Sequence, residues 1–308
     1  MSTMMERRRF LKSAGVLAGV GMSALGVAAA QTEAAETNAK LPRMFLGCCA
    51  YSYRQELTGG RMTMEDFIRK AVELRLDAVD MTVYYLKSTD AGYLEGLRHL
   101  AFENGVPFSG AACGATMVQA DAAKRAAVLE QMKQWVDAAD RLGASHLRVF
   151  AGPVPQGGEK QQAIDWVVEA MKAACAYSGE RGIALGLEDH AGVSQSADVC
   201  LEIMERVGSP YARINLDITN FIATETADAY AQMVACVPYA HVAHIRDHFK
   251  DGTPVDMERV GRIFAGAAFR GYMSVEYEPS WAGGEPSATG APKLIEKTRE
   301  ICRKYSSV

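Results

Sequence analysis

The segment IALGLEDHAGVSQSADVCLEIMERVGSPYARINLDITN (residues 183–220) contains a complete strand–helix–strand unit. Its apolar run at 183–187 stops at a cluster of polar residues, and an amphipathic run at 196–207 follows before a second apolar run begins. A helix that connects two short buried strands is the crossover connection of a parallel sheet. This segment therefore predicts an α/β fold with parallel strands.

The same alternation fills the chain from residue 44 onward. Short apolar or β-branched runs predict strands over 44–53, 77–85, 107–115, 145–152, 183–190, 212–220, 240–248 and 271–278. Longer amphipathic runs predict helices over 64–76, 89–104, 121–142, 161–180, 196–207, 225–237, 256–269 and 292–305. Eight such units in 308 residues predict a (β/α)8 TIM barrel. A Rossmann fold is disfavoured because no G-x-G-x-x-G opens the first helix.

The first thirty residues do not follow this pattern. The run RRRFLK (7–12) precedes a weakly apolar stretch rich in Ala and Gly that ends at Ala28–Ala30, which is typical of a twin-arginine signal peptide. We expect a signal over 1–30, a linker over 31–42 and the barrel over 43–308. This predicts a periplasmic or otherwise exported protein, with the twin-arginine translocase as its partner during export. A retained membrane anchor is the alternative, although the stretch is short and only mildly apolar for stable membrane insertion.

The composition of the chain limits the class of protein and its partners. The chain is 49% hydrophobic and 23% charged with a net charge of −4, as in ordinary globular domains. It has no basic cluster, which argues against a nucleic-acid partner. Its seven cysteines form no C-x-x-C motif, and an odd number indicates buried reduced thiols rather than complete pairing. Export of an already folded protein is compatible with such thiols.

Acids and histidines gather where the last four predicted strands end. Successive side chains of a strand alternate between faces, so Glu188 and His190 point the same way. The next three strands reach Asp217, His244 and Glu276 at the same relative position. Burying three neighbouring carboxylates without a cation would be strongly unfavourable. Three carboxylates and one imidazole predict one divalent metal ion, for which Mn²⁺ is the first choice and Mg²⁺, Co²⁺ or Zn²⁺ are alternatives.

The motifs at these strand ends carry a family resemblance. They read EDH at 188–190, DITN at 217–220, HIRD at 244–247 and a glutamate at 276. In order and spacing they resemble the sugar-phosphate isomerase/epimerase superfamily, the xylose isomerase-like TIM barrels. That family has E-x-H, D-x-x-H/N, H-x-K/R-D and Glu at strands five to eight. The resemblance covers residues 44–305.

The resemblance implies a metal site and an acid–base pair. The implied metal ligands are Glu188, Asp217, His244 and Glu276. In the ketose epimerases of the family, the two glutamates also act as acid and base on opposite faces of the substrate. A metal chelated by a carbonyl and its neighbouring hydroxyl acidifies the intervening C–H and stabilises an enediolate. The resemblance further implies that His190 and Arg246 hold substrate oxygens.

Three further residues are candidates for substrate binding. Asn220 stands where several ketose epimerases have histidine, just as Arg246 stands where many members have lysine. Arg148 has the parity of a side chain that faces the barrel interior, where it either reaches the substrate or forms a salt bridge with the barrel wall. Tyr51, together with Tyr53, either lines the pocket or packs at its rim.

Two further histidines, one further acid and one loop also lie in or next to the predicted strands. His146 and His241 are expected to face the helices, so neither is predicted as a ligand. Asp80 is either an acid at the rim or the cap of a turn. The Gly- and Pro-rich stretch 277–292, which contains Trp281, is expected to be a loop. It either covers the site or reaches a neighbouring subunit of a homo-oligomer.

The expected function is a metal-dependent isomerase or epimerase that acts on a ketose or keto-sugar. A lyase or dehydratase for a keto-glycoside or keto-inositol would form the same enediolate and then expel a leaving group. Non-catalytic sugar binding is a third alternative. The related DNA-repair endonucleases need additional histidines on strands two and three, and neither 77–85 nor 107–115 contains one. Export favours a small carbohydrate substrate without phosphate.

Overall fold

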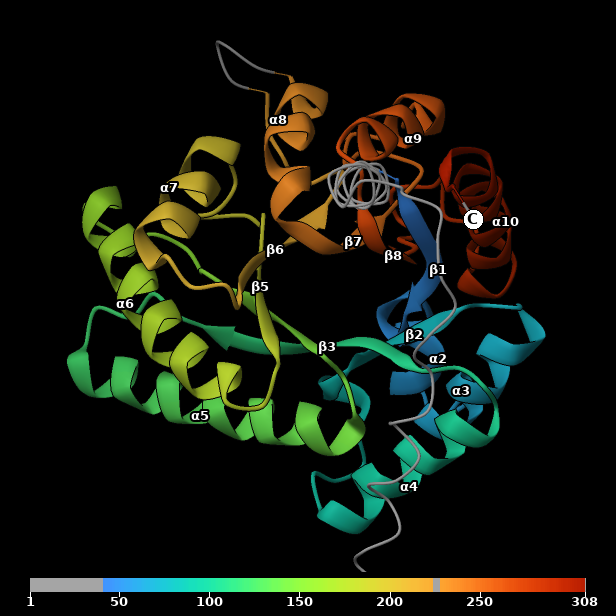
Figure 1. Cartoon of the computed structure of the whole chain (residues 1–308), viewed down its shortest axis with the longest axis horizontal. Helices are drawn as coiled ribbons and strands as arrows, with labels where there is room; N and C mark the ends of the chain where they lie inside the picture. The colour runs from blue at the N-terminus through green and yellow to red at the C-terminus, as the bar shows by residue number, and fades with distance from the viewer. Residues whose placement is uncertain (1–40, 224–227, 308) are drawn as a thin grey trace, which may run out of the picture. The chain divides into compact units, whose positions relative to one another are not determined.

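The computed structural model describes residues 41–223 and 228–307. Eight parallel strands close into a barrel in chain order, and the last strand pairs with the first (Figure 1). The strands are β1 (Arg43–Cys49), β2 (Ala78–Thr82), β3 (Phe108–Thr116), β4 (His146–Phe150), β5 (Ala184–Glu188), β6 (Ala212–Asp217), β7 (Ala240–Ile245) and β8 (Arg270–Val275). The predicted (β/α)8 fold is confirmed.

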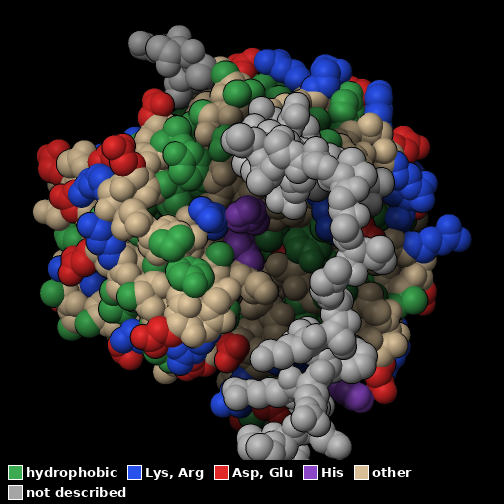
Figure 2. Space-filling view, viewed as in Figure 1, with side chains coloured by type: hydrophobic (Ala, Val, Ile, Leu, Met, Phe, Trp, Pro, Cys, Tyr) green, Lys and Arg blue, Asp and Glu red, His purple; other side chains and the backbone are tan. Residues whose placement is uncertain are grey.

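Helices follow the strands along the chain and surround the barrel in Figure 1. They are α2 (Arg54–Thr58), α3 (Met64–Glu73), α4 (Ala91–Glu103), α5 (Ala122–Leu142), α6 (Lys160–Gly179), α7 (Ala197–Val207), α8 (Ala229–Cys236), α9 (Met257–Gly266) and α10 (Ser287–Tyr305). Figure 2 shows Lys, Arg, Asp and Glu side chains mainly around the periphery of the visible face, and histidine side chains near its centre and at its lower right edge.

The N-terminal segment is not part of this description. The signal predicted over 1–30 and nearly all of the linker predicted over 31–42 lie outside the described residues. Within the described ranges, no helix has the length and apolar character needed to cross a membrane. The seven cysteines all lie in the described part of the chain, where they are buried and free, as the odd cysteine count indicated.

Seven of the eight predicted strands, all except β3, end two to four residues earlier than expected, and after β1 and β2 a 3₁₀ helix takes the place of the strand end. β1 stops at Cys49, and Ala50–Tyr53 forms the 3₁₀ helix η1, while Val83–Tyr85 forms a second one, η2, after β2. The apolar run continues past Cys49 because the side chain of Tyr53 is buried in the hydrophobic core, where its ring lies 5.9 Å from that of Phe67 on α3. An apolar run in the sequence therefore shows which residues are buried, whereas the strand itself can end before the run does.

The last helix begins earlier than expected. α10 starts at Ser287 and contains Pro292, which was expected at its first position. Its first turn packs closely under another aromatic ring: a Cβ added to Gly290 would lie 2.1 Å from Cζ of Tyr277. Tertiary packing thus outweighs the weak helix propensity of this Gly- and Pro-containing turn. The loop expected over 277–292 is correspondingly shorter.

The predicted start of the helix over 225–237 cannot be compared directly, because residues 224–227 lie outside the described residues. The described helix α8 begins at Ala229, where the Asp228 side chain accepts a hydrogen bond from the Ala231 N–H (2.7 Å). Such a cap satisfies one of the free N–H groups of the first turn.

His146 lies inside the barrel, and the expectation that it faces the helices is wrong. It shares its parity on β4 with Arg148, and its ring fits between two glycines on the neighbouring strands. A Cβ would lie 3.0 Å from its Nδ1 if added to Gly110 and 2.1 Å from its Nε2 if added to Gly186. Burial in this space lowers the pKa of His146 to about 4.

This low pKa predicts loss of stability in mild acid. The unfolded chain has a histidine pKa of about 6.5, so the neutral imidazole stabilises the fold above that pH, and the contribution is lost as the pH falls towards 4. We expect His146 to account for about 2 kcal/mol of lost unfolding free energy between pH 7 and pH 5. Urea denaturation at both pH values checks this, with a His146→Asn variant as the reference. An equal loss in both proteins would contradict the prediction.

Candidate active site

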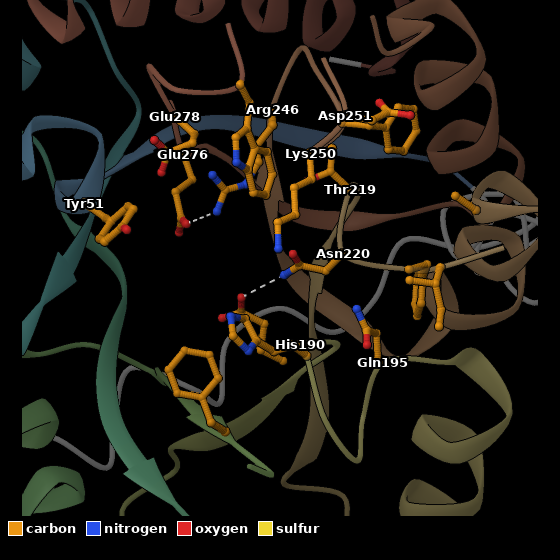
Figure 3. Close-up of a pocket in the computed structure, with 18 of the residues that line it drawn as sticks. Tyr51, His190, Gln195, Thr219, Asn220, Arg246, Lys250, Asp251, Glu276 and Glu278 are labelled. Atoms are coloured by element: carbon orange, nitrogen blue, oxygen red, sulfur yellow. Dashed lines mark hydrogen bonds and ion pairs between the residues drawn. The ribbon is translucent and has the colours of Figure 1, made fainter. Parts of the chain in front are cut away.

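A pocket of about 670 Å³ opens at the carboxyl ends of the strands. Most of the residues predicted for the site line it, namely Tyr51, Arg148, Glu188, His190, Asn220, Arg246 and Glu276. In Figure 3, the labelled side chains of His190, Asn220, Arg246 and Glu276 point into the same space. The predicted ligands Asp217 and His244 are fully buried and contact the lining residues Arg246 and Glu276.

The four predicted metal ligands come together. Glu188 and Asp217 are the last residues of β5 and β6, and Asp217 pairs in register with His244 on β7. Ligand atoms of these three residues all lie within 4.8 Å of one another. Glu276 directly follows β8, and its Oε2 lies 2.9 Å from Nδ1 of His244. This cluster of oxygen and nitrogen donors fits a divalent cation.

Two buried arginines neutralise the carboxylates of the cluster. Nη1 of Arg148 lies 2.5 Å from Oε2 of Glu188. Nε of Arg246 lies 2.9 Å from Oδ2 of Asp217, and its Nη2 donates to Glu276. Each guanidinium also has a buried nitrogen without a hydrogen-bond partner, Nε in Arg148 and Nη1 in Arg246. Since buried N–H groups are nearly always bonded, these donors are suited to oxygens of a ligand.

The charges of the cluster act on one another. Burial by itself would raise the pKa of Glu276, but the neighbouring His244 and Arg246 outweigh it and hold that pKa well below its usual value. Burial by itself would lower the pKa of His244, but Glu276 and Asp80 outweigh it and raise that pKa well above its usual value. Glu276 is therefore an ionised carboxylate, which both a metal ligand and a general base must be.

Asp189 ties two strand ends together, a role that sequence reasoning missed. It points away from the pocket, as strand alternation predicts, and its Oδ1 accepts a hydrogen bond from the backbone N–H of Asp217 (2.7 Å). Burial and the nearby Asp217 carboxylate raise the pKa of Asp189 well above its usual value. The Thr219 hydroxyl donates to Oδ1 of Asp217 (2.7 Å), and the Ser194 hydroxyl donates to the Glu188 carbonyl (2.7 Å).

Aromatic side chains form much of the pocket wall. Tyr51 lines the pocket, with the guanidinium carbon of Arg54 4.5 Å from its ring centroid, whereas Tyr53 belongs to the core. The ring of His190 lies 4.7 Å from that of Phe150. The guanidinium carbon of Arg246 lies 4.6 Å from the centroid of Trp281.

Other lining residues were not predicted, among them Tyr84, Phe150, Gln195, Lys250 and Asp251. Phe150 has the same parity as Arg148 on β4, which is a signal that sequence reasoning had available. Lys250 and Asp251 lie in a turn next to the isolated bridge between His248 and Pro254, which no strand pattern indicated. Figure 3 shows the Lys250 side chain extending towards Asn220.

Comparison with known proteins adds a family and a shared fold. The model of the xylose isomerase-like TIM barrel family matches residues 68–304. The IOLI protein with a bound zinc atom is 15% identical, with 86% of this chain and 100% of that chain covered and a TM-score of 0.70. D-psicose 3-epimerase with D-tagatose, from Clostridium cellulolyticum H10, is 13% identical, with 85% and 99% covered and a TM-score of 0.69.

A third similar structure is the probable 3-DHS dehydratase AsbF from Bacillus anthracis. It is 14% identical, with 84% of this chain and 99% of that chain covered and a TM-score of 0.65. At these identities the three similarities show the fold. No curated protein sequence matches the chain.

Proposed function

Since the chain belongs to the xylose isomerase-like TIM barrel family, we propose that it is a divalent-metal-dependent isomerase or epimerase of a ketose or keto-sugar. The observation that carries this proposal is the meeting of Glu188, Asp217, His244 and Glu276 at the carboxyl ends of four neighbouring strands. A divalent ion held by these residues, with Mn²⁺ as the first choice, would polarise the substrate carbonyl and acidify the adjacent C–H.

The two glutamates carry the proton transfers. Glu188 is held by Arg148 and by the side-chain amide of Asn220 (3.2 Å), while Glu276 is held by Arg246 and His244. One glutamate, as the carboxylate, removes the proton next to the carbonyl, and the other, as the carboxylic acid, gives its proton to the opposite face of the resulting enediolate. The two side chains therefore exchange protonation states in each turnover. Return of the proton to the same carbon is epimerisation, and return to the neighbouring carbon is isomerisation.

The remaining polar residues of the pocket bind and orient the sugar. The unpartnered Nη1 of Arg246 and Nε of Arg148 donate to oxygens on which negative charge develops. His190 and Asn220 line the same pocket and bind hydroxyl groups. Trp281 and Phe150 offer apolar surfaces that pack against the C–H groups of a sugar and limit access of water.

Deuterium exchange tests this reaction. The Mn²⁺-loaded protein is incubated in D₂O with ketoses and with 3-keto-glycosides, and products are followed by NMR. We expect deuterium next to the carbonyl and an altered sugar configuration. Deuterium together with loss of a leaving group would establish the lyase alternative, which starts from the same enediolate. Absence of exchange with every substrate would exclude both reactions.

Removal of the metal gives a separate prediction. We expect dialysis against a chelator to abolish exchange, because neither glutamate alone acidifies the C–H enough, and addition of Mn²⁺ to restore it. Exchange rates before dialysis, after it and after addition of each divalent ion provide the measurement. Full activity in chelated protein with no residual metal would contradict metal dependence.

We also propose export through the twin-arginine pathway, on the basis of RRRFLK at 7–12. Replacing Arg7 and Arg8 together with lysine is expected to retain the protein in the cytoplasm, since this pathway reads the arginine pair. Cell fractionation measures the distribution. The single variant Arg9→Lys is the matched control, because position 9 is not part of the pair. Equal export of all three proteins would contradict the proposal.

A further inference from the structure

Asp80 is a buried carboxylate that the proposed reaction does not use. It lies in the middle of β2, pairs in register with Cys49 and Gly110, and is 2% exposed. Among the described residues, His244 is the only ion-pair partner of its side chain. Burying a carboxylate costs several kcal/mol unless hydrogen bonds and opposite charge compensate for it. Its position within a strand also excludes the turn cap that the sequence left open.

Both contacts of Asp80 involve the strands that carry metal ligands. Its Oδ2 lies 3.0 Å from Nε2 of His244 on β7, and the Ser274 hydroxyl on β8 donates to the same oxygen (3.3 Å). Ser274 precedes Glu276 by two residues, and Ser274 pairs in register with His244. Asp80 therefore reaches across the barrel interior from β2 to the part of the sheet that carries the candidate metal site.

The two ring nitrogens of His244 face different surroundings. Nδ1 faces Glu276, with 2.9 Å to Oε2, whereas Nε2 faces Asp80. A neutral imidazole carries one N–H, and a carboxylate next to one nitrogen keeps the proton there. The other nitrogen is then left with a free electron pair. Carboxylates face both nitrogens of His244, but Glu276 beside Nδ1 is itself a candidate metal ligand, whereas Asp80 beside Nε2 is not. An ion held by Glu276 would therefore take the electron pair of Nδ1 and leave the proton on Nε2.

We propose that Asp80 is a positioning residue for the metal site: it holds the His244 ring in place and keeps its proton on Nε2, so that Nδ1 is free to bind the ion. A carboxylate behind a metal-binding histidine orients the ring and makes it a better donor, and loss of such a partner lowers metal affinity about 10- to 100-fold. This inference rests on the proposed function only in taking the four-residue cluster as a metal site.

Metal affinity provides the first test. Titration calorimetry with Mn²⁺ compares the full-length protein with Asp80→Asn and Asp80→Ala. The control Asp77→Asn makes the same chemical change just before the same strand, where Oδ2 of Asp77 accepts a hydrogen bond from the Leu46 N–H (2.8 Å). We expect Kd to rise about 10- to 100-fold in both Asp80 variants and to stay unchanged in the control.

The tautomer of His244 is the second readout, and a purely structural role for Asp80 would not change it. Zn²⁺-loaded protein with ¹⁵N-labelled histidine is examined by NMR, and a His244→Gln variant assigns the signals. We expect the proton of His244 on Nε2 in the wild type and a loss of this single state in Asp80→Ala.

The outcomes separate the two proposals. Unchanged Kd in folded Asp80 variants, or a wild-type proton on Nδ1 of His244, would overturn the role of Asp80 while leaving the metal site intact. A wild-type protein that binds no divalent ion would overturn the proposed function and this inference together.

Discussion

Replacement of Glu276 with glutamine is expected to lower turnover at least about a thousand-fold. Glutamine keeps the size of the side chain but cannot accept the proton, and its neutral oxygen is a weaker ligand for a divalent cation. The ion pairs of Glu276 with His244 and Arg246 are lost at the same time. Turnover is measured by deuterium exchange at saturating Mn²⁺, so that weaker metal binding does not by itself account for the effect.

The matched control for this variant is Glu285→Gln. Glu285 pairs with Lys293 at the surface (2.6 Å) and does not line the pocket, so we expect turnover to stay unchanged. Thermal unfolding of both variants verifies that they fold. If folded, metal-loaded Glu276→Gln had the turnover of the wild type, Glu276 would not take part in proton transfer, and the proposed acid–base pair with Glu188 would be wrong.

Replacement of Gly186 with alanine is expected to lower the free energy of unfolding by about 3 kcal/mol. The added methyl group would lie 2.1 Å from Nε2 of His146 and 3.0 Å from Cβ of Asn215. The His146 ring has little room to retreat, because Gly110 bounds its other nitrogen. Urea denaturation measures the change. Gly96→Ala in α4 is the control, since no atom lies within 4 Å of the added carbon, and we expect a small gain in stability there.

A second substitution identifies the cause of this loss. Replacing His146 with alanine in the Gly186→Ala background removes the ring that the methyl group meets. We expect the two substitutions to be coupled favourably by at least about 1 kcal/mol in a double-mutant cycle. Additive effects would show that the strain lies elsewhere.

The sequence predicted those parts of the site that depend on one strand at a time. Alternation along a strand placed Glu188 and His190 on one face, with Asp189 on the other. The barrel order brought Glu188 and Asp217 next to His244, which in turn contacts Glu276. These deductions need only the period of a strand and the rule that barrel sites lie at the carboxyl ends of strands.

The features that were missed depend on pairs of residues far apart in the sequence. His146 can face the interior only because Gly110 and Gly186 leave space on the neighbouring strands. Asp80 acquires its partner His244 only when the barrel closes, at a separation of 164 residues. Parity with Arg148 was enough to place His146 on the interior face of β4. No local pattern, however, shows that two glycines leave space for its ring or that Asp80 contacts His244, because these contacts form only in the closed barrel.

The hydrogen bonds at the ends of β5 and β6 also affect the entropy of ligand binding. The Asp189 carboxyl holds the backbone of Asp217, and the Thr219 hydroxyl holds the side chain of Asp217. The Asp217 side chain therefore loses its rotamer freedom when the protein folds. An ion or sugar then meets a side chain that is already ordered, and binding loses less conformational entropy. Asp189 is not itself a candidate ligand of the ion or the sugar. Its substitution would still weaken binding, because the Asp217 side chain would be less ordered in the unbound protein.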